Sequence, residues 1–345
     1  MSNSAEPRTG NREPATEARP RVLTNMVFWQ SAVWTRNTRS IYDVERREAH
    51  RAPHPAWIEA ALLLGLQSRN DVVVTMGARE SLAYGLLCAL LFRPSRQIMC
   101  EVFIDEEHSS NPLWKLKTAL YRLVARRSIG VLTNSSAEVE SVSKRFGIPR
   151  AKVRYVPMHS NIHEPSMSDR NDGFVLSAGR TLRDYDTLLK VAPRIKAPIL
   201  MIAGGRHSIS TSLPENVTLL REISREQYLD HLRRCAVVAI PLIPSARATG
   251  QVVLLEAMAY GKPVVATRSA GTADHIEHGR NGLLVEPGDG EALAHEINRL
   301  LGDQDLARRI GQQAVEDVKA RYTFDIHAEA KLEAIRELAS EPQAL

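Results

Sequence analysis

Short apolar segments alternate with longer helical patterns along most of this chain, and this alternation limits the folds that it can adopt. Residues 71–75 (DVVVT) form a continuous β-branched run, which is typical of a strand that helices cover on both faces. Gly77 follows, and then an apolar helical pattern over residues 80–92. Strand, helix and strand at this spacing are typical of a parallel sheet with right-handed crossovers. The sequence therefore predicts an α/β protein.

One polar segment, residues 157–173, interrupts the alternation and has no apolar period. A second alternation of strands and helices begins at residue 174, and a chain of 345 residues is long enough for about two domains. We therefore predict two Rossmann-like domains with a cleft between them. The predicted parts are a disordered tail over residues 1–20, an N-terminal domain over 21–160, a linker over 161–173, a C-terminal domain over 174–325 and a final helix over 326–345 that can return to the N-terminal domain.

The chain is mildly basic, with a formal net charge of +5. Such a surface suits nucleic acid, phosphate or an anionic membrane equally well. The basic residues lack interleaved aromatic residues and no nucleic-acid-reading motif is present, so we expect no nucleic-acid partner. No apolar run reaches the length of a membrane-spanning helix, and the first twenty residues lack the apolar core of a signal peptide. We expect a cytoplasmic protein.

The cysteines and glycines argue against a metal or a dinucleotide cofactor. Cys88, Cys100 and Cys235 are widely spaced in apolar stretches, which is typical of buried thiols in a reducing compartment. No zinc spacing or P-loop is present, and no Gly-x-Gly-x-x-Gly follows the early strands. We therefore expect neither a metal nor a resident cofactor.

Residues 248–261 (ATGQVVLLEAMAYG) carry the first candidate site. Thr249, Gly250 and Gln251 stand directly before an apolar helical run, where free backbone N–H groups and the helix dipole favour a phosphate. Glu256 lies inside that run, and a carboxylate in apolar surroundings needs a partner. A ribose diol would serve, while an ordinary glutamate near a helix N-terminus is the other interpretation.

A second candidate site follows the strand predicted over residues 174–178. Arg180 and Arg183 lie at the carboxyl edge of the predicted parallel sheet, where open α/β sheets bind ligands. Two guanidinium groups suit a diphosphate, both as counter-charge and as stabilisers of a departing phosphate. The alternative is a pair of surface arginines near Asp184 and Asp186.

The helix predicted over residues 111–127 contains five basic residues and no acidic one. Lys115, Arg122 and Arg126 fall within about 40° of one another at 100° per residue. We predict that an apolar stripe packs on the sheet while the basic face meets an anionic membrane or a phosphorylated acceptor, a solvated basic face being the alternative. The stripe consists of Leu116, Leu120, Leu123 and Val124.

A cluster of acidic residues and one histidine follows the strand predicted over residues 97–103. These side chains could perform acid–base chemistry near a reacting oxygen, or form a solvated acidic loop. The cluster consists of Glu101, Asp105, Glu106, Glu107 and His108.

Three segments together resemble glycosyltransferase family 4, whose members are retaining, nucleotide-sugar-dependent enzymes of the GT-B fold. These segments are GRTLRDYDTLL from residue 179, TGQVVLLEAMAYGKPVVATRSAGTADHIEHGRNGLLVEPGD from residue 249, and NSSAEVESVSKRFGIPRAKVRYVP from residue 134. The resemblance implies that Glu256 binds the donor ribose and that Thr249, Gly250 and Gln251 meet the diphosphate or the sugar. It also implies that Arg180 stabilises the leaving group, that Ile223 belongs to the base-binding segment, and that neither a metal nor a protein nucleophile is needed.

The chain departs from the family pattern at three points. Ala248 replaces the first of two glutamates, Tyr185 replaces a lysine, so that Arg183 would supply the second positive charge, and the first domain lacks a histidine at the expected strand end. The resemblance predicts a hexosyltransferase-type enzyme that moves a sugar to a hydroxyl acceptor at the inner face of the membrane. The acceptor is lipid-linked or a polysaccharide, or else a soluble small molecule. A catalytically silent GT-B scaffold that binds a nucleotide or a partner protein is the alternative.

Overall fold

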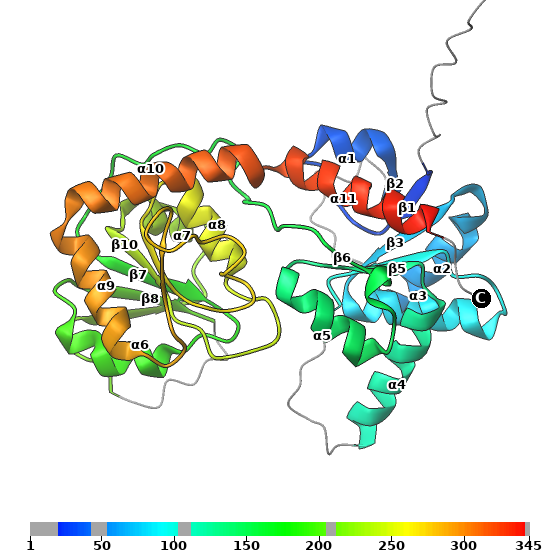
Figure 1. Cartoon of the computed structure of the whole chain (residues 1–345), viewed down its shortest axis with the longest axis horizontal. Helices are drawn as coiled ribbons and strands as arrows, with labels where there is room; N and C mark the ends of the chain where they lie inside the picture. The colour runs from blue at the N-terminus through cyan, green and yellow to red at the C-terminus, as the bar shows by residue number, and fades with distance from the viewer. Residues whose placement is uncertain (1–19, 43–53, 103–111, 205–211, 342–345) are drawn as a thin grey trace, which may run out of the picture.

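The computed structural model describes residues 20–42, 54–102, 112–204 and 212–341 of the chain. Apart from Pro20, the tail predicted over residues 1–20 lies outside the described residues. The described part contains two six-stranded sheets, one in each half of the chain, with helices on both faces. Figure 1 shows the two halves side by side, with α10 and α11 running across the top of the view.

The sheet of the N-terminal half has the order β2–β1–β3–β4–β5–β6, and every neighbouring pair is parallel. The valine run predicted as a strand lies in β3, and Val72, Val73 and Val74 are buried because helices cover both faces. The strands are β1 (Val22–Thr24), β2 (Thr38–Ser40), β3 (Val72–Met76), β4 (Gln97–Cys100), β5 (Gly130–Thr133) and β6 (Val153–Tyr155).

Two groups of helices cover this sheet, as Figure 1 shows. α2, α3, α4 and α5 pack on one face, while α1 and the last helix of the chain, α11, pack on the other. The final segment of the chain thus returns to the N-terminal sheet. The helices are α1 (Ala32–Asn37), α2 (Ala56–Leu66), α3 (Ala78–Leu90), α4 (Pro112–Arg127), α5 (Ser136–Phe146) and α11 (Phe324–Ser340), with short 3-10 turns at η2 (Gln67–Arg69) and η3 (Arg150–Lys152).

The sheet of the C-terminal half has the order β12–β11–β10–β7–β8–β9 and is also parallel throughout. Its strands are β7 (Val175–Gly179), β8 (Ile199–Ala203), β9 (Val217–Arg221), β10 (Val237–Ile240), β11 (Val264–Thr267) and β12 (Leu283–Val285). Its helices are α6 (Tyr185–Val191), η4 (Ala192–Arg194), α7 (Arg225–Arg234), α8 (Gln251–Ala259), α9 (Gly290–Gly302) and α10 (Gln304–Arg321). α6, α9 and the first half of α10 cover one face, while α7, α8 and the second half of α10 cover the other.

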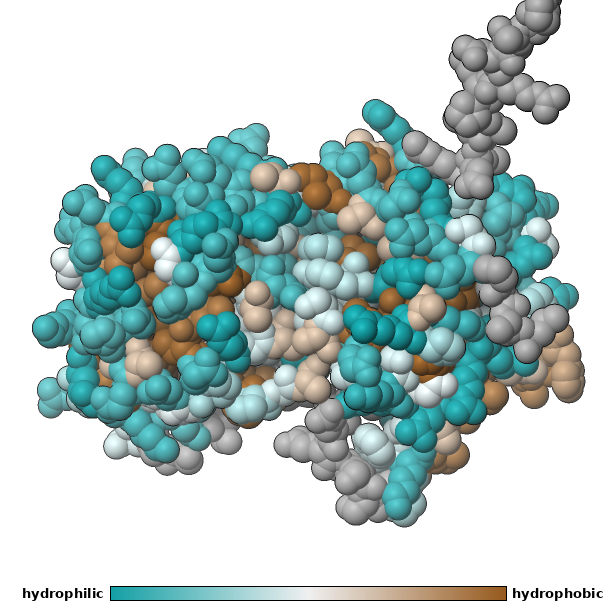
Figure 2. Space-filling view, viewed as in Figure 1, coloured by the Kyte–Doolittle hydropathy of each residue, from teal (hydrophilic) through white to brown (hydrophobic). Residues whose placement is uncertain are grey.

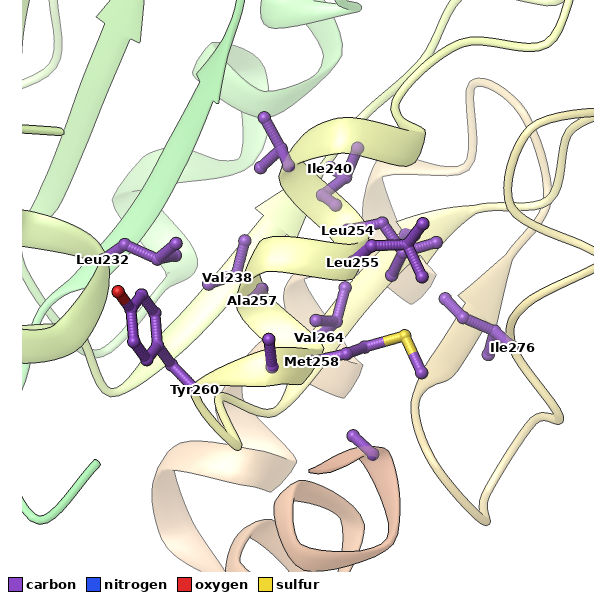
Figure 3. Packing of buried hydrophobic residues seen from close by; sticks show 14 of the residues in the cluster. Leu232, Val238, Ile240, Leu254, Leu255, Ala257, Met258, Tyr260, Val264 and Ile276 are labelled. Atoms are coloured by element: carbon purple, nitrogen blue, oxygen red, sulfur yellow. The ribbon is translucent and has the colours of Figure 1, made fainter. Parts of the chain in front are cut away.

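Helix α8 is the most deeply buried helix of this half: eight of its nine residues are buried, and only Val252 is exposed. Figure 3 shows Leu254, Leu255 and Met258 of α8 packed among the side chains of neighbouring elements, including Val264 and Ile276. This packing leaves α8 no freedom to shift, so its N-terminus is held at the carboxyl edge of the sheet.

No helix in the described ranges is long and apolar enough to cross a membrane. The three cysteines are buried free thiols. Burial raises the pKa of Cys100 and of Cys235 to about 12, so both behave as small apolar side chains.

Candidate donor-binding site

The carboxyl edges of the two sheets face each other, and hydrogen bonds join their loops. The Ser135 hydroxyl, after β5, donates to the Ala270 carbonyl, after β11, at 2.6 Å. The backbone N–H and the hydroxyl of Ser136 donate to the Asp274 carboxylate at 2.8 and 2.5 Å. Asp274 therefore satisfies the N-terminus of α5 from the other half of the molecule.

The predicted phosphate-binding loop lies at this junction. Gly250 begins α8 with a φ of +85°, in the left-handed region that favours glycine, and an added Cβ would crowd Ile240 and Leu242 at 3.2–3.3 Å. Gln251 is buried, and its Nε2 donates to the Asn134 carbonyl at 2.7 Å. Thr249 is buried as well. The contact of these residues with a diphosphate stays a prediction.

Glu256 is fully buried in the middle of α8. Its Oε1 accepts hydrogen bonds from Nη2 of Arg225 at 2.7 Å and from Nδ2 of Asn161 at 3.2 Å. Because these bonds join Glu256 to α7 and to the linker, its carboxylate has specific partners outside its own helix. The alternative interpretation, a glutamate stabilised mainly by the dipole of α8, does not describe this position. Burying a carboxylate is costly unless it is paired, and Arg225 provides the pairing charge.

The second oxygen of this carboxylate is less well satisfied. Oε2 of Glu256 is buried, and no guanidinium or amide of the described residues donates to it. The Tyr228 hydroxyl lies beside this carboxylate, and burial, the Glu256 charge and a hydrogen-bonding interaction with Glu256 together raise the pKa of Tyr228. The site thus contains an acceptor oxygen with spare capacity beside a phenol that stays protonated.

Sequence reasoning missed Arg225, Tyr228 and Asn161. A usable signal was present for the first two, because Ser224 and Gln227 form a capping box that fixes the start of α7 two residues after Ile223. Ile223, predicted to contact the base, is half-buried in the short loop before that cap. The first turn of α7, which follows the predicted base-binding segment, therefore lies next to Glu256.

The structure places the two predicted catalytic arginines differently. The Arg180 side chain, 75% exposed, extends beyond β7 with its Nη2 3.7 Å from Oε2 of Glu222. Arg183 is only 7% exposed, and its Nε and Nη1 donate to the carbonyls of Ala178 and Thr181, both at 3.0 Å. Its guanidinium therefore points back under its own loop, so the two arginines predicted at this edge are not both open to a ligand.

Burial has a consequence for the chemistry that Arg183 can perform. Desolvation lowers the pKa of Arg183, and an added Cβ at Gly179 would collide with its guanidinium. Neither arginine bonds to Asp184, which caps α6 by accepting from Thr187 N. Of these two arginines, Arg180 is therefore the one whose side chain is free to reach a ligand. The catalytic role of Arg183 stays a prediction.

Glu138, on the first turn of α5, is a further residue that the sequence did not single out. Its Oε1 accepts a 2.8 Å hydrogen bond from the backbone N–H of Ala248, and burial raises its pKa. A carboxylate from the N-terminal half thus lies beside the position where the family pattern has glutamate. Of the predicted acid–base cluster, Glu101 is described, whereas Asp105 to His108 lie outside the described residues.

Helix α4 packs on the sheet through a different face from the one predicted. Thr118, Tyr121, Val124 and Ala125 are buried, whereas Leu116 and Leu123 are exposed, so the predicted leucine stripe is wrong except at Val124 and the partly buried Leu120. The basic residues are exposed as expected. Two of them also lie along α5, where Arg122 donates to the Arg145 carbonyl and Arg126 to the Gly147 carbonyl.

Within the ranges that the structure describes, no group of three or more His, Cys, Asp or Glu side chains is arranged to hold a metal ion. The expectation of a metal-free site stays a prediction.

Comparison with solved structures defines the fold. Alr3699/HepE of Anabaena, solved in complex with UDP, superposes with a TM-score of 0.65 over 91% of this chain and 98% of its own, at 18% identity. A glycosyltransferase of Rickettsia africae superposes with a TM-score of 0.65 over 94% and 100% of the two chains, at 15% identity. The chain therefore has the GT-B fold, as predicted.

Sequence comparison finds a family match in the C-terminal half and relatives whose similarity extends beyond it. Residues 173–303 match the family described as glycosyl transferases group 1. D-inositol 3-phosphate glycosyltransferase of Corynebacterium urealyticum is 29% identical over 62% of this chain and 58% of its own length. The lipopolysaccharide core biosynthesis glycosyltransferase LpsE of Rhizobium meliloti is 28% identical over 49% and 50%. The chain thus matches less than two thirds of the length of either relative.

These matches confirm the resemblance to glycosyltransferases. Membership of family 4 in particular stays a prediction, as do the roles of the individual site residues.

Proposed function

We propose that this chain is a retaining glycosyltransferase, of hexosyltransferase type, that moves a sugar from a nucleotide-diphosphate sugar to a hydroxyl acceptor. The observation that carries the proposal is the buried carboxylate of Glu256, whose Oε1 accepts from Arg225 and Asn161 while Oε2 lies beside Tyr228 with room for a further donor. A ribose diol supplies two hydroxyl donors, which is the chemistry that such an oxygen can accept. The match of residues 173–303 to group 1 glycosyltransferases supports the same reading.

Different elements around Glu256 would bind different parts of the donor. Ile223 would contact the base, and Glu256 would accept from the ribose. The first N–H groups of α8, with Thr249, Gly250 and Gln251, would meet the diphosphate or the sugar, since helix N-termini attract anions. Support for this order comes from Arg225, which lies two residues from Ile223 and contacts Glu256.

Arg180 would stabilise the charge that develops on the departing diphosphate. The bond between the sugar C1 and the phosphate oxygen breaks, the acceptor oxygen bonds to C1 on the same face, and the acceptor proton leaves with the phosphate. The proposal names no protein nucleophile and no metal. The exposed side chain of Arg180 leaves it able to turn toward such a ligand.

We propose a lipid-linked or polysaccharide acceptor on the cytoplasmic side of the membrane. Two kinds of observation support this choice. The name of LpsE places that relative in lipopolysaccharide core synthesis, and another relative, from Mycobacterium tuberculosis, is a phosphatidylinositol monomannoside mannosyltransferase that is 29% identical over 44% of this chain. The basic helix α4 also suits a phosphorylated acceptor. A soluble small-molecule acceptor is the competing proposal.

A thermal-shift panel of UDP, GDP, ADP, dTDP and CMP, with and without magnesium, tests the donor site. A ligand present at 100 times its dissociation constant stabilises the folded state by about 2.7 kcal/mol. We expect one diphosphate to raise the melting temperature without magnesium, because guanidinium groups and a helix N-terminus replace the metal. No shift with any nucleotide would overturn the proposal.

A catalytically silent GT-B scaffold, binding a nucleotide or a partner protein, is the second candidate. Ala248 favours it, since the methyl group there cannot hold the hydroxyls of a donor sugar, and Glu138 is committed to its backbone N–H. Nucleotide binding without hydrolysis or transfer, across donors and acceptors, would support the scaffold. Release of the nucleoside diphosphate in the presence of an acceptor would exclude it.

A further inference from the structure

The helices α2, α3 and α4 present an unusual number of apolar side chains to solvent. Of the fourteen large hydrophobic residues exposed in the described part of the chain, eight lie on these helices or directly after α3. Soluble surfaces rarely gather apolar side chains in this way without a function. We name this set the α2–α4 apolar surface; it consists of Trp57, Leu62, Leu90, Leu91, Phe92, Leu113, Leu116 and Leu123.

The contacts of α4 with α3 explain why its leucines face outward. The Tyr121 hydroxyl donates to the Ala78 carbonyl at 2.7 Å, and Val124 fills the space that Gly85 leaves open on α3. Fixing Tyr121 and Val124 inward turns Leu116 and Leu123 to the opposite side. These two leucines are seven residues apart, so they lie within about 20° of each other on the helix.

Cations flank these leucines on both sides of α4. At 100° per residue, Lys115 and Arg126 lie on one side of Leu116 and Leu123, and Arg127 lies on the other. No acidic residue occurs between Pro112 and Arg127. A helix whose solvent-facing side carries leucines with cations beside them has the composition of a helix that lies in a membrane interface.

The two neighbouring helices extend the same surface. Glu59 is the one charged residue of α2, and it is buried with its carboxylate bonded to Asn25, so the exposed face of α2 is apolar. α3 ends in Leu90, which Leu91 and Phe92 follow, and the Phe92 side chain is 94% exposed. Arg93 comes directly after it, and Arg96 lies three residues further along the chain. The five lysines and arginines of α4 have no acidic residue among them on that helix, whereas residues 56–127 as a whole contain nine Lys or Arg and seven Asp or Glu.

We propose that the α2–α4 apolar surface docks on an anionic lipid membrane. Its leucines, Trp57 and Phe92 would enter the boundary between headgroups and acyl chains, while the lysines and arginines of α4 meet lipid phosphates. The five cations of α4, with no acidic residue on that helix, favour a lipid surface over a second protein copy, because two copies of α4 would repel each other. Figure 2 shows hydrophilic and hydrophobic residues side by side toward the projecting end of α4.

The orientation of α4 gives this surface a consequence for function. α4 begins after β4, at the carboxyl edge of its sheet, and Figure 1 shows its N-terminal end extending beyond the neighbouring helices. A membrane that contacts Leu113 and Leu116 would therefore lie near the edge where the two halves of the molecule meet. The proposal does not depend on the sugar-transfer chemistry, and its test measures membrane binding alone.

Vesicle flotation with the full chain tests the proposal. We expect binding to phosphatidylcholine vesicles that contain about 30% phosphatidylglycerol, weak binding to phosphatidylcholine alone, and loss of binding between about 0.1 and 0.5 M salt. The double variant L116S/L123S removes only apolar area and should weaken binding about tenfold or more. The double variant K115Q/K117Q should weaken binding to the anionic vesicles and leave the weak residual binding unchanged.

Matched variants on the other half control for general effects. L213S and K190Q replace an exposed leucine and an exposed lysine there, and both should bind vesicles as the parent chain does. Unchanged melting temperatures would show that every variant is folded. The proposal is overturned if the chain binds no vesicle, if L116S/L123S binds as well as the parent chain, or if these substitutions instead dissolve a homodimer seen by light scattering.

Discussion

Nη2 of Arg225 lies 2.7 Å from Oε1 of Glu256, so a half-exposed guanidinium covers a carboxylate that is itself fully buried. The two residues come from α7 and α8 and are 31 positions apart. A ribose can reach this carboxylate only if Arg225 shares it or swings into solvent, and the exposure of Arg225 permits the second movement. The ion pair therefore occupies the proposed donor site when no donor is bound.

Replacing Glu256 with alanine tests this arrangement. We expect Glu256→Ala to weaken nucleotide-diphosphate binding by about tenfold or more, because the ribose loses its acceptor. Unfolding free energy should fall by about 1–3 kcal/mol, since Asn161 loses its partner and a small cavity remains. Calorimetric titration and urea unfolding measure the two effects. Glu226→Ala, an exposed position on α7, is the control, and a Glu256→Ala chain with full affinity would refute the ribose role.

Arg180 and Arg183, which follow β7, should have different roles: we expect Arg180 to bind the ligand and Arg183 to stabilise the fold. Arg180→Ala removes an exposed side chain, so we expect a change in stability within about 0.5 kcal/mol and a clear loss of diphosphate affinity. Arg183→Ala leaves the carbonyls of Ala178 and Thr181 without their buried donors and should cost about 2 kcal/mol or more.

Urea unfolding and diphosphate titration on both variants distinguish these roles. Arg183→Lys is the matched control, because it keeps the charge and loses the forked geometry that reaches two carbonyls. A stable Arg183→Ala chain that binds no diphosphate would instead make Arg183 the ligand-binding cation.

The fold could be predicted from the sequence because its signals are local. The valine run of β3 and the glycine before α8 each indicate their structure within a few residues. The contacts of Glu256 with Asn161 and of Ala248 with Glu138 join positions 95 and 110 residues apart. No local pattern contains such pairs, so only the folded chain identifies them.

Helix α4 shows a second reason why the sequence did not predict every contact correctly. Its sequence offers two apolar faces, one with Leu116 and Leu123 and one with Tyr121 and Val124, and periodicity alone does not rank them. The choice depends on the neighbouring helix, where Gly85 admits Val124. The prediction took the longer leucine stripe, and packing selected the other face.

Restoring the glutamate of the family pattern at position 248 should harm this chain. Ala248 is buried, and its backbone N–H already bonds to the Glu138 carboxylate. Ala248→Glu places a second carboxylate beside the first, and we expect a loss of about 1–3 kcal/mol in unfolding free energy at pH 7. Because the added charge would raise the pKa of both carboxyls, the loss should shrink as pH falls toward 5.

Urea unfolding at both pH values measures this effect. Ala248→Gln is the control with equal size and no charge, and Glu138→Gln combined with Ala248→Glu should recover part of the loss. If Ala248→Glu is as stable as the parent chain at pH 7, the Glu138 carboxylate does not constrain position 248.

His275 should make the stability of this chain depend on pH. It is buried at the junction of the two halves, with Nε2 3.2 Å from Nε2 of Gln251, and burial lowers its pKa to about 4. The unfolded chain binds a proton near pH 6.5, so the stability that neutral His275 contributes is present above that value. It is lost as pH falls from about 6.5 to 4, by up to about 3 kcal/mol at 1.36 kcal/mol per pKa unit.

Unfolding free energies at pH 7 and pH 5 for His275→Gln and the parent chain measure this contribution. Glutamine has no titrating proton, so the variant should lose less stability on acidification than the parent chain, by about 2 kcal/mol. His295→Gln, at an exposed position on α9, should follow the parent chain. Parallel curves for all three proteins would mean that His275 is solvated enough to titrate normally, and the junction would then be open in solution.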